Sequence, residues 1–301
     1  MARLLRGARP LTNGRKQPPR RKTVIAISSH VARGAVGNRA IVFALETLGH
    51  PVWSVPTIVL PWHPGHGPAT RIVPEPARFD SLLDDLARAP WLDEVGAVIT
   101  GYLGHASQAA AAARLIEAVR ARDPDALYLC DPVIGDAGGL YVPADTAAAI
   151  RDRLLPLANI ATPNLFELAW LTGMDTSQRQ RTLGAAAALP PPTVVVTSSP
   201  GTSEDRIGNL LVEKGHATLF EHQRLFCPPN GPGDLTAALV LSGMLGGRSS
   251  HEAVEGATRS VYSVLSAAVA RGADELALAS DAGLLLRPDA EVNVHPIDSG
   301  S

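Results

Sequence analysis

The chain has 301 residues and 46% of them are hydrophobic, so it can bury a sizeable core in one α/β domain or in two smaller ones. Only 4% of the residues are aromatic, while alanine and valine are abundant, which favours helices packed on a parallel sheet over a β-sandwich. The formal net charge is −2, but the charges are unevenly distributed: residues 1–22 carry eight Lys or Arg and no acid. The remaining residues include 19 basic and 29 acidic side chains. This acidic remainder argues against a nucleic-acid-binding surface.

The basic segment 1–22 comes first along the chain. It lacks the apolar core of a secretory signal and resembles an organelle transit peptide only weakly. We expect an incidental disordered tail; an upstream-start artefact and an arm that binds an acidic partner are the alternatives. No run of 18 apolar residues occurs, so we expect no contact with a membrane. Cys130 and Cys227 are far apart and form no CxxC motif, which indicates neither disulfides nor structural zinc and fits a reducing cytoplasm.

From Thr23 onward, short apolar runs alternate with segments of helical spacing. The apolar runs predict strands at 23–28, 52–59, 97–100, 127–130, 160–161 and 193–197, and a hairpin of 209–212 with 217–220. The helical spacing predicts helices at 38–48, 79–87, 107–121 (with Ser107 as N-cap), 143–154, 165–171, 237–245 and 254–270. Residues after about Gly283 are expected to be irregular.

This alternation predicts an α/β fold: three layers, α/β/α, with a mainly parallel central sheet. No repeat and no linker is evident between Thr23 and Ala282, so we expect residues 23–301 to form a single domain. In an open sheet of this kind, ligands bind beyond the carboxyl ends of the strands. The polar residues of interest follow one predicted strand end after another, which favours a shared site over unrelated local roles.

The segment Asn-Gly-Pro-Gly-Asp at 230–234 carries the strongest chemical signal. It is a glycine-bracketed turn that leads into an apolar helix, where free backbone N–H groups can hold a phosphate or a developing anion. The carboxylate of Asp234 on the same turn can accept a proton from an alcohol. A plain loop-to-helix junction, with Asp234 stabilising the helix dipole, is the structural alternative.

Three further oxygen donors follow neighbouring strands: Asp131, Asn164 and Glu167. Each has a structural explanation, since Asp131 precedes a proline turn, Asn164 can cap the next helix, and Glu167 falls in the first turn of that helix. Together they offer the hard oxygen ligands that Mg²⁺ prefers when it holds ATP phosphates, usually through waters.

Competing motifs are missing or weak. There is no GxxxxGK[ST] motif and the chain has only three lysines, which argues against a P-loop enzyme and a protein kinase. No GxGxxG follows the first strand, which argues against a dinucleotide-binding domain. His63 and His66 flank a Pro-Gly turn without a third metal ligand, and we interpret them as loop histidines that touch substrate or solvent. A hydrolase built on Ser29 and His30 is rejected, because adjacent side chains on an extended segment point apart and no GxSxG is present.

The sequence resembles the pyridoxal kinases of the ribokinase-like superfamily over roughly residues 23–270. The matching stretches are SSHV (28–31), GAVGN (34–38), VW (52–53), GYLG (101–104), YLCDPVIGD (128–136), GLYVP (139–143), TPNLFE (162–167) and GPGD (231–234). The CDPVxGD and GYLG stretches are specific to pyridoxal kinases, whereas the GxGD turn marks the superfamily.

The resemblance implies ATP-dependent phosphorylation of the 5′-hydroxyl of pyridoxal, and of pyridoxine and pyridoxamine, by a homodimer that uses Mg²⁺ and a monovalent cation such as K⁺. It assigns Asp234 as the catalytic base, with Gly231 and Gly233 in the anion hole. Asp234 also contacts the substrate, together with Ser29, which bonds the pyridine ring, and His63. The nucleotide side is implied to comprise Asp131, Asn164, Glu167, Thr197 and Ser198, with Asp131 and Glu167 also on the metal side.

Several positions depart from the family pattern. The substrate-covering segment 62–65 reads WHPG and keeps only His63, Ala32 and Arg33 replace a Val-Tyr type pair, and segment 175–192 is short. Pro232 removes one backbone donor from the anion-hole turn, although its fixed φ suits a helix start. Two alternatives therefore stay open: a hydroxymethylpyrimidine kinase, and a non-catalytic vitamin B6-binding protein on the same fold.

Overall fold

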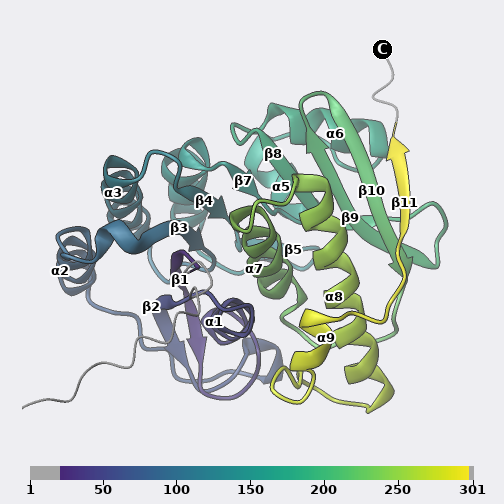
Figure 1. The fold of residues 1–301 in the computed structure, drawn as a ribbon, viewed down its shortest axis with the longest axis horizontal. Coiled ribbons are helices and arrows are strands. Elements are labelled where there is room, and N and C mark those ends of the chain that lie inside the picture. Colours follow the sequence, from purple (N-terminus) through teal and green to yellow (C-terminus); the bar gives the residue numbers. More distant parts are fainter. Residues whose placement is uncertain (1–20, 298–301) are drawn as a thin grey trace, which may run out of the picture.

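The computed structural model describes residues 21–297, and within that range nine strands form one sheet in the order β11-β10-β9-β8-β7-β4-β3-β1-β2 (Figure 1). Every neighbouring pair from β2 to β8 is parallel, and β9, β10 and β11 are added antiparallel. The strands of this sheet are β1 (Thr23–Val31), β2 (Val52–Leu60), β3 (Val95–Thr100), β4 (Leu127–Cys130), β7 (Ile160–Ala161), β8 (Thr193–Pro200), β9 (Arg206–Glu213), β10 (His216–Gln223) and β11 (Asn293–Ile297). A small separate hairpin pairs β5 (Gly135–Asp136) with β6 (Gly139–Leu140).

Helices cover both faces of the sheet, as predicted. One face carries α1 (Asn38–Thr47), α7 (Pro232–Leu245), α8 (Ser250–Ala270) and α9 (Ala282–Leu286). The other carries α2 (Pro76–Ala87), α3 (Ser107–Arg122), α4 (Ala144–Ala149), α5 (Leu165–Thr172) and α6 (Arg179–Ala188), with a π-helical turn at Ile150–Leu154 after α4. Short 3-10 turns lie at Pro64–His66, Leu92–Glu94 and Leu155–Leu157. The confirmed architecture is thus three-layered, with a mainly parallel sheet.

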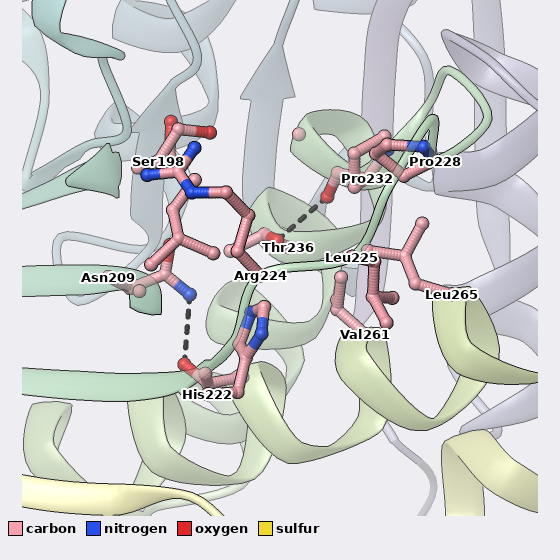
Figure 2. Close-up of a pocket in the computed structure, with 15 residues that line it drawn as sticks. Ser198, Asn209, His222, Arg224, Leu225, Pro228, Pro232, Thr236, Val261 and Leu265 are labelled. Atoms are coloured by element: carbon pink, nitrogen blue, oxygen red, sulfur yellow. Dashed lines mark hydrogen bonds between the residues drawn. The ribbon is translucent and has the colours of Figure 1, made fainter. Parts of the chain in front are cut away.

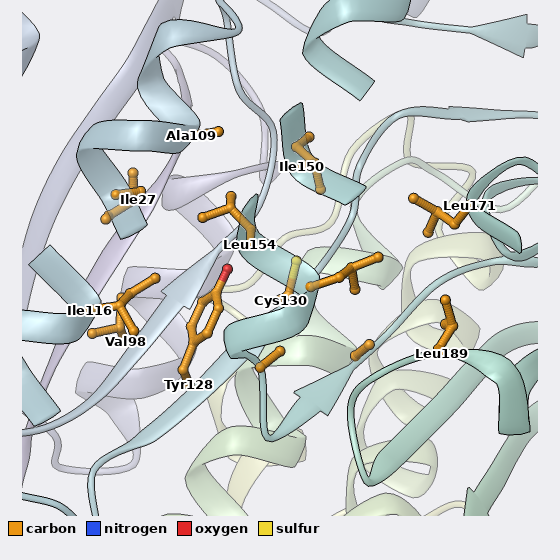
Figure 3. Packing of buried hydrophobic residues seen from close by; sticks show 14 of the residues in the cluster. Ile27, Val98, Ala109, Ile116, Tyr128, Cys130, Ile150, Leu154, Leu171 and Leu189 are labelled. Carbon is orange, nitrogen blue, oxygen red and sulfur yellow. The ribbon is translucent and has the colours of Figure 1, made fainter. Parts of the chain in front are cut away.

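The strand period of two explains the two cores. Along β1, Val24 and Ala26 pack with α1 and α7, whereas Ile25 and Ile27 pack on the opposite face. The second core holds Val98, Tyr128, Ile116 and Leu154 between the sheet and the helices α3 to α6 (Figure 3). Because β1 lies between β3 and the edge strand β2 and is buried on both faces, its carboxyl end is firmly held, and so are the residues that follow it.

Several local predictions are corrected by the structure. The residues after Gly283 are not irregular, since α9 ends at Leu286 and β11 adds an edge strand to the sheet. Ser107 is not the N-cap of α3: Ala106 holds that place, and the Ser107 hydroxyl lies 2.9 Å from the His105 Nδ1 atom. The short segment 175–192 contains a helix, α6, that the sequence did not indicate.

Of the predicted basic tail, residues 1–20 lie outside the described residues; Lys22 forms an ion pair with Asp123. That residues 23–301 form a single domain remains our proposal. No helix within residues 21–297 is long and apolar enough to cross a bilayer.

Candidate active site at the start of helix α7

Two cavities meet at the N-terminus of α7. The first, called here the α7–β8 cavity, has a volume of 240 Å³ and is lined by Thr197 and Ser198 from β8 and by Pro232 and Gly233 from α7 (Figure 2). The second, the α7–β1 cavity, has a volume of 470 Å³ and is lined by residues that include Ser29, His63, Gly231 and Asp234. The turn before α7 thus forms a wall of both cavities.

Gly231 gives this turn its shape. Its φ of +101° lies in the left-handed region, and a Cβ atom here would sit 2.2 Å from the Ala35 carbonyl oxygen, so only glycine fits. Pro232 is the first helical residue, where a missing N–H is best tolerated. No side chain of another residue caps the helix start, which leaves the first-turn amide of Gly233 available to an anion.

The Asp234 carboxyl lies in the first turn of α7 and faces the α7–β1 cavity. Burial raises its pKa to about 6, while hydrogen bonds from the backbone amides of Gly37 and of Asp234 itself act in the opposite direction. A carboxylate with this pKa is ionised at neutral pH and can still accept a proton, as a general base must.

Asp131 lies behind this turn, at the end of β4. Its side chain is buried and accepts a hydrogen bond of 2.8 Å from the Thr162 hydroxyl. Burial, followed by the negative charges of Glu167 and Asp234, raises the pKa of Asp131 well above its usual range. The charges of Glu167 and Asp234 thus oppose the ionisation of Asp131, and a nearby cation would stabilise its ionised form.

Glu167 and Asn164 form a capping box at the start of α5, which confirms the structural roles expected for both. The Glu167 carboxylate accepts hydrogen bonds from the backbone N–H groups of Asn164 (2.9 Å), Ile134 (3.0 Å) and Gly135 (3.4 Å). Burial nevertheless raises its pKa to about 7. Asp131, Asn164 and Glu167 line neither cavity, so they lie behind the site and hold the 131–135 loop in place.

Ser29 and Ser198 both lie at irregularities in their strands. The pairing of β1 with β2 shifts register between Ser28 and His30, and the pairing of β8 with β9 shifts between Val196 and Ser199, where Ser198 has a φ of +53°. Such bulges redirect side chains at strand ends. Ser29 faces the α7–β1 cavity and Ser198 the α7–β8 cavity.

The structure bears on the two hypotheses for histidines that the sequence disfavoured, a hydrolase built on Ser29 and His30 and a metal site at His63 and His66. His30 lines a separate groove beside Arg39, while Ser29 lines the α7–β1 cavity, so the two neighbours do point apart. His63 lines the α7–β1 cavity, where burial lowers its pKa and its Nδ1 atom accepts the Gly65 N–H at 3.1 Å. Among the described residues, no three His, Cys, Asp or Glu side chains are grouped to hold a metal ion.

The structure adds site residues that the sequence reasoning missed. The α7–β1 cavity is also lined by Arg71, Tyr102, Asp136, Tyr141 and Asn230, and the α7–β8 cavity by Asn209, His222 and Arg224. Tyr102 and Asp136 belong to the GYLG and CDPVIGD stretches, which could have indicated them. The second group comes from β9 and β10 and from the residue after β10, where the strand-end rule for parallel sheets gives no signal.

Comparison with known proteins decides the family. The family model described as phosphomethylpyrimidine kinase matches residues 80–278. Pyridoxal kinase PdxY of Rubrobacter xylanophilus is 36% identical over 287 residues, which cover 91% of this chain and 97% of that protein. The chain belongs to the pyridoxal kinase family.

Further pyridoxal kinases agree with this assignment. The pyridoxine/pyridoxal/pyridoxamine kinase of Bordetella bronchiseptica is 38% identical over 266 residues, covering 85% of this chain and 93% of that protein. The solved pyridoxal kinase of Leishmania donovani, in complex with ADP and pyridoxamine, has a TM-score of 0.84 and 27% identity, and the match covers 92% of this chain and 99% of that one. The predicted fold, family and kinase activity are confirmed.

Proposed function

We propose that this pyridoxal kinase transfers the γ-phosphoryl group of ATP to the 5′-hydroxyl of pyridoxal, pyridoxine and pyridoxamine at the N-terminus of α7. One observation carries the proposal: two cavities share the same helix start, and Asp234 faces one of them. Transfer between two bound molecules requires this juxtaposition, because both must be held in line with one anion-binding point.

The α7–β1 cavity is assigned to the vitamer and the α7–β8 cavity to the nucleotide. The Leishmania donovani kinase was solved with one molecule of each kind, ADP and pyridoxamine. In this chain the α7–β8 cavity contains a cation for phosphate, Arg224, whose side chain extends toward Ser198 (Figure 2). His222, stacked on Tyr262 with ring centroids 4.1 Å apart, adds an aromatic wall.

The chemistry follows from the α7 turn. The 5′-oxygen of the vitamer attacks the γ-phosphorus, the bond from that phosphorus to the β,γ-bridging oxygen breaks, and ADP leaves. Asp234 takes the proton of the attacking hydroxyl. The amide of Gly233 stabilises the negative charge on the transferring group. The missing N–H of Pro232 therefore costs little activity if Gly233 is the binding donor.

The carboxyl groups of Asp131 and Glu167 fit a role on the metal side of the site. The negative charge of Glu167 opposes the ionisation of Asp131, so a cation would be favoured near them. Because neither lines a cavity, they would hold Mg²⁺ through waters. Bound Mg²⁺ supplies charge neutralisation for the phosphates. The use of K⁺, the homodimer and the cytoplasmic location remain predictions. Analytical ultracentrifugation would test whether the chain is a dimer.

Replacement of Asp234 tests the proposal. We expect Asp234→Asn to lower kcat by about 10²–10⁴-fold, the usual contribution of a general base, while calorimetry still detects pyridoxal binding. Asp85→Asn, an exposed carboxylate on α2, is the matched control and should behave as wild type. A folded Asp234→Asn protein with near-normal turnover would sink the assignment.

Hydroxymethylpyrimidine kinase activity stays the second candidate, because the matching family model is described as a phosphomethylpyrimidine kinase. It predicts turnover of the aminopyrimidine alcohol in the α7–β1 cavity. The non-catalytic alternative predicts pyridoxal binding without ATP-dependent product. Calorimetry followed by a kinase assay separates these outcomes.

A further inference from the structure

We infer that Glu275 is a positioning residue that holds together the walls of the α7–β1 cavity and thereby sets the affinity for the vitamer. This inference rests on the proposed function of that cavity. Glu275 lies between α8 and α9 and does not line the cavity. Its side chain is only 13% exposed, so a carboxylate is kept nearly buried at a place where it touches no substrate.

The Glu275 carboxylate binds two chain segments at once. Its Oε1 atom lies 2.9 Å from His66 Nε2 and 3.4 Å from Arg33 Nη1, and its Oε2 atom accepts the Ala35 N–H at 3.4 Å. The backbone of Glu275 also forms an isolated parallel bridge with Asn230. One residue therefore connects the segment after β1, the segment after β2 and the turn before α7.

These three segments form part of the walls of the cavity. Val36 and Gly37 line it from the first segment, His63 and Gly65 from the second, and Asn230 with Gly231 from the third. Each contact of Glu275 falls on or within a few residues of a lining position. A shift of the carboxylate would move the walls relative to one another and change the width of the cavity.

The backbone is shaped to admit this carboxylate. Gly34 has a φ of +108°, and a Cβ atom on it would lie 2.6 Å from Glu275 Oε1. A larger residue at position 34 would both strain the turn and push the carboxylate away. The segment after β2 has only the three-residue turn Pro64–His66 as regular structure, so a charge-assisted contact to His66 contributes much of its positioning.

Both contacts involve places where the sequence departs from the pyridoxal kinase pattern. Arg33 stands in the altered pair after β1, and His66 directly follows the altered segment 62–65. The structure brings both to the same carboxylate. We therefore expect Glu275, Arg33 and His66 to act as a unit that holds these two segments together.

The test compares Glu275→Gln, His66→Ala and the double variant with Asp274→Asn. Asp274 binds the same Arg33 at 2.6 Å and is 63% exposed, and its carboxylate is paired with Arg33 rather than hydrogen-bonded to His66. Its variant is therefore the matched control. Glu275→Gln and His66→Ala should each raise the KM for pyridoxal about tenfold, with kcat and the KM for ATP within about twofold of wild type. The double variant should be no worse than the more affected single one, because residues that act through each other are not additive.

Hydrogen exchange provides a readout that needs no turnover. The amides of residues 62–67 should exchange faster in Glu275→Gln than in wild type, and Asp274→Asn should leave them unchanged. If wild type fails to phosphorylate pyridoxal, the proposed function fails while the exchange result still decides the role of Glu275. Unchanged exchange, additive effects, or equal changes in the KM values for ATP and pyridoxal would overturn the inference.

Discussion

At the scale of single residues, the proposed mechanism depends on the Asp234 carboxyl group as the base. Its burial beside the α7–β1 cavity raises its pKa to about 6, which leaves it a stronger base than an exposed aspartate. The same burial costs stability, because an ionised carboxylate is less well solvated there than in the unfolded chain. Activity and stability should therefore respond to pH in opposite directions.

The pH dependence of turnover follows from this pKa. Since the base must be ionised, kcat/KM for pyridoxal should be level near pH 7.5 and fall about tenfold per pH unit below about pH 6. Steady-state kinetics between pH 5 and 8 measure this decrease in kcat/KM. A rate that stays level down to pH 5 would exclude Asp234 as the titrating base.

The pH dependence of stability has the opposite sign. The pKa of Asp234 is higher in the folded chain, about 6, than its ordinary value of 3.8, so the folded state binds more protons between these values. The resulting stabilisation is complete below about pH 4 and is lost as the pH rises through 6. We expect Asp234→Asn to unfold at a higher temperature than wild type at pH 8, with a smaller difference at pH 5. Equal differences in calorimetric midpoints at both pH values would contradict this.

At the scale of elements, local sequence signals predicted most helices and strands but not all of them. The capping residue Asn164 and the C-terminal Gly173 mark α5 at both ends, and the helix runs from Leu165 to Thr172, one residue longer than the predicted 165–171. Helix α6 was missed because no side chain caps its start at Gln178. Strand β11 was missed because it is an edge strand with largely exposed residues, so it lacks a buried apolar run.

The capping box of α5 should contribute more stability than its counterpart in α8. Glu167→Ala leaves the buried amide of Ile134 and the half-buried amide of Asn164 without their carboxylate partner and should lower the free energy of unfolding by about 3 kcal/mol. Glu252→Ala breaks the same motif at the exposed start of α8, where water replaces the carboxylate, and should cost about 1 kcal/mol. Urea unfolding measures both values, and equal losses would show that Glu167 does not hold the 133–135 loop.

Alanine substitutions at the two glycines of the α7 turn should have different effects on thermal stability. Gly231→Ala forces a Cβ atom against the Ala35 carbonyl at a positive φ and should lower the thermal midpoint. Gly233 has no atom within 4 Å of the equivalent position, so Gly233→Ala should fold as wild type and weaken ATP binding by narrowing the α7–β8 cavity. Similar thermal midpoints for the two variants would contradict this account of the turn.

At the scale of the whole molecule, the site exists because parallel strands end at one edge of a sheet. That rule could be applied to the sequence, and it located Ser29, Asp131, Asn164, Thr197 and the α7 turn. It could not show that Asp131 and Glu167 lie behind the cavities, because this depends on how the 131–135 loop packs on α5. Nor could it locate Arg224, which follows an antiparallel strand, or Glu275, which joins three segments far apart in the sequence.

The most direct test of the central claim is a coupled kinase assay of the wild-type protein with ATP and Mg²⁺. The substrates are pyridoxal, pyridoxine, pyridoxamine and hydroxymethylpyrimidine, each assayed beside Asp234→Asn. We predict ATP-dependent phosphorylation of pyridoxal that requires Asp234, with hydroxymethylpyrimidine turned over far more slowly. Preferential turnover of hydroxymethylpyrimidine, or pyridoxal binding without any ATP-dependent product, would contradict the account.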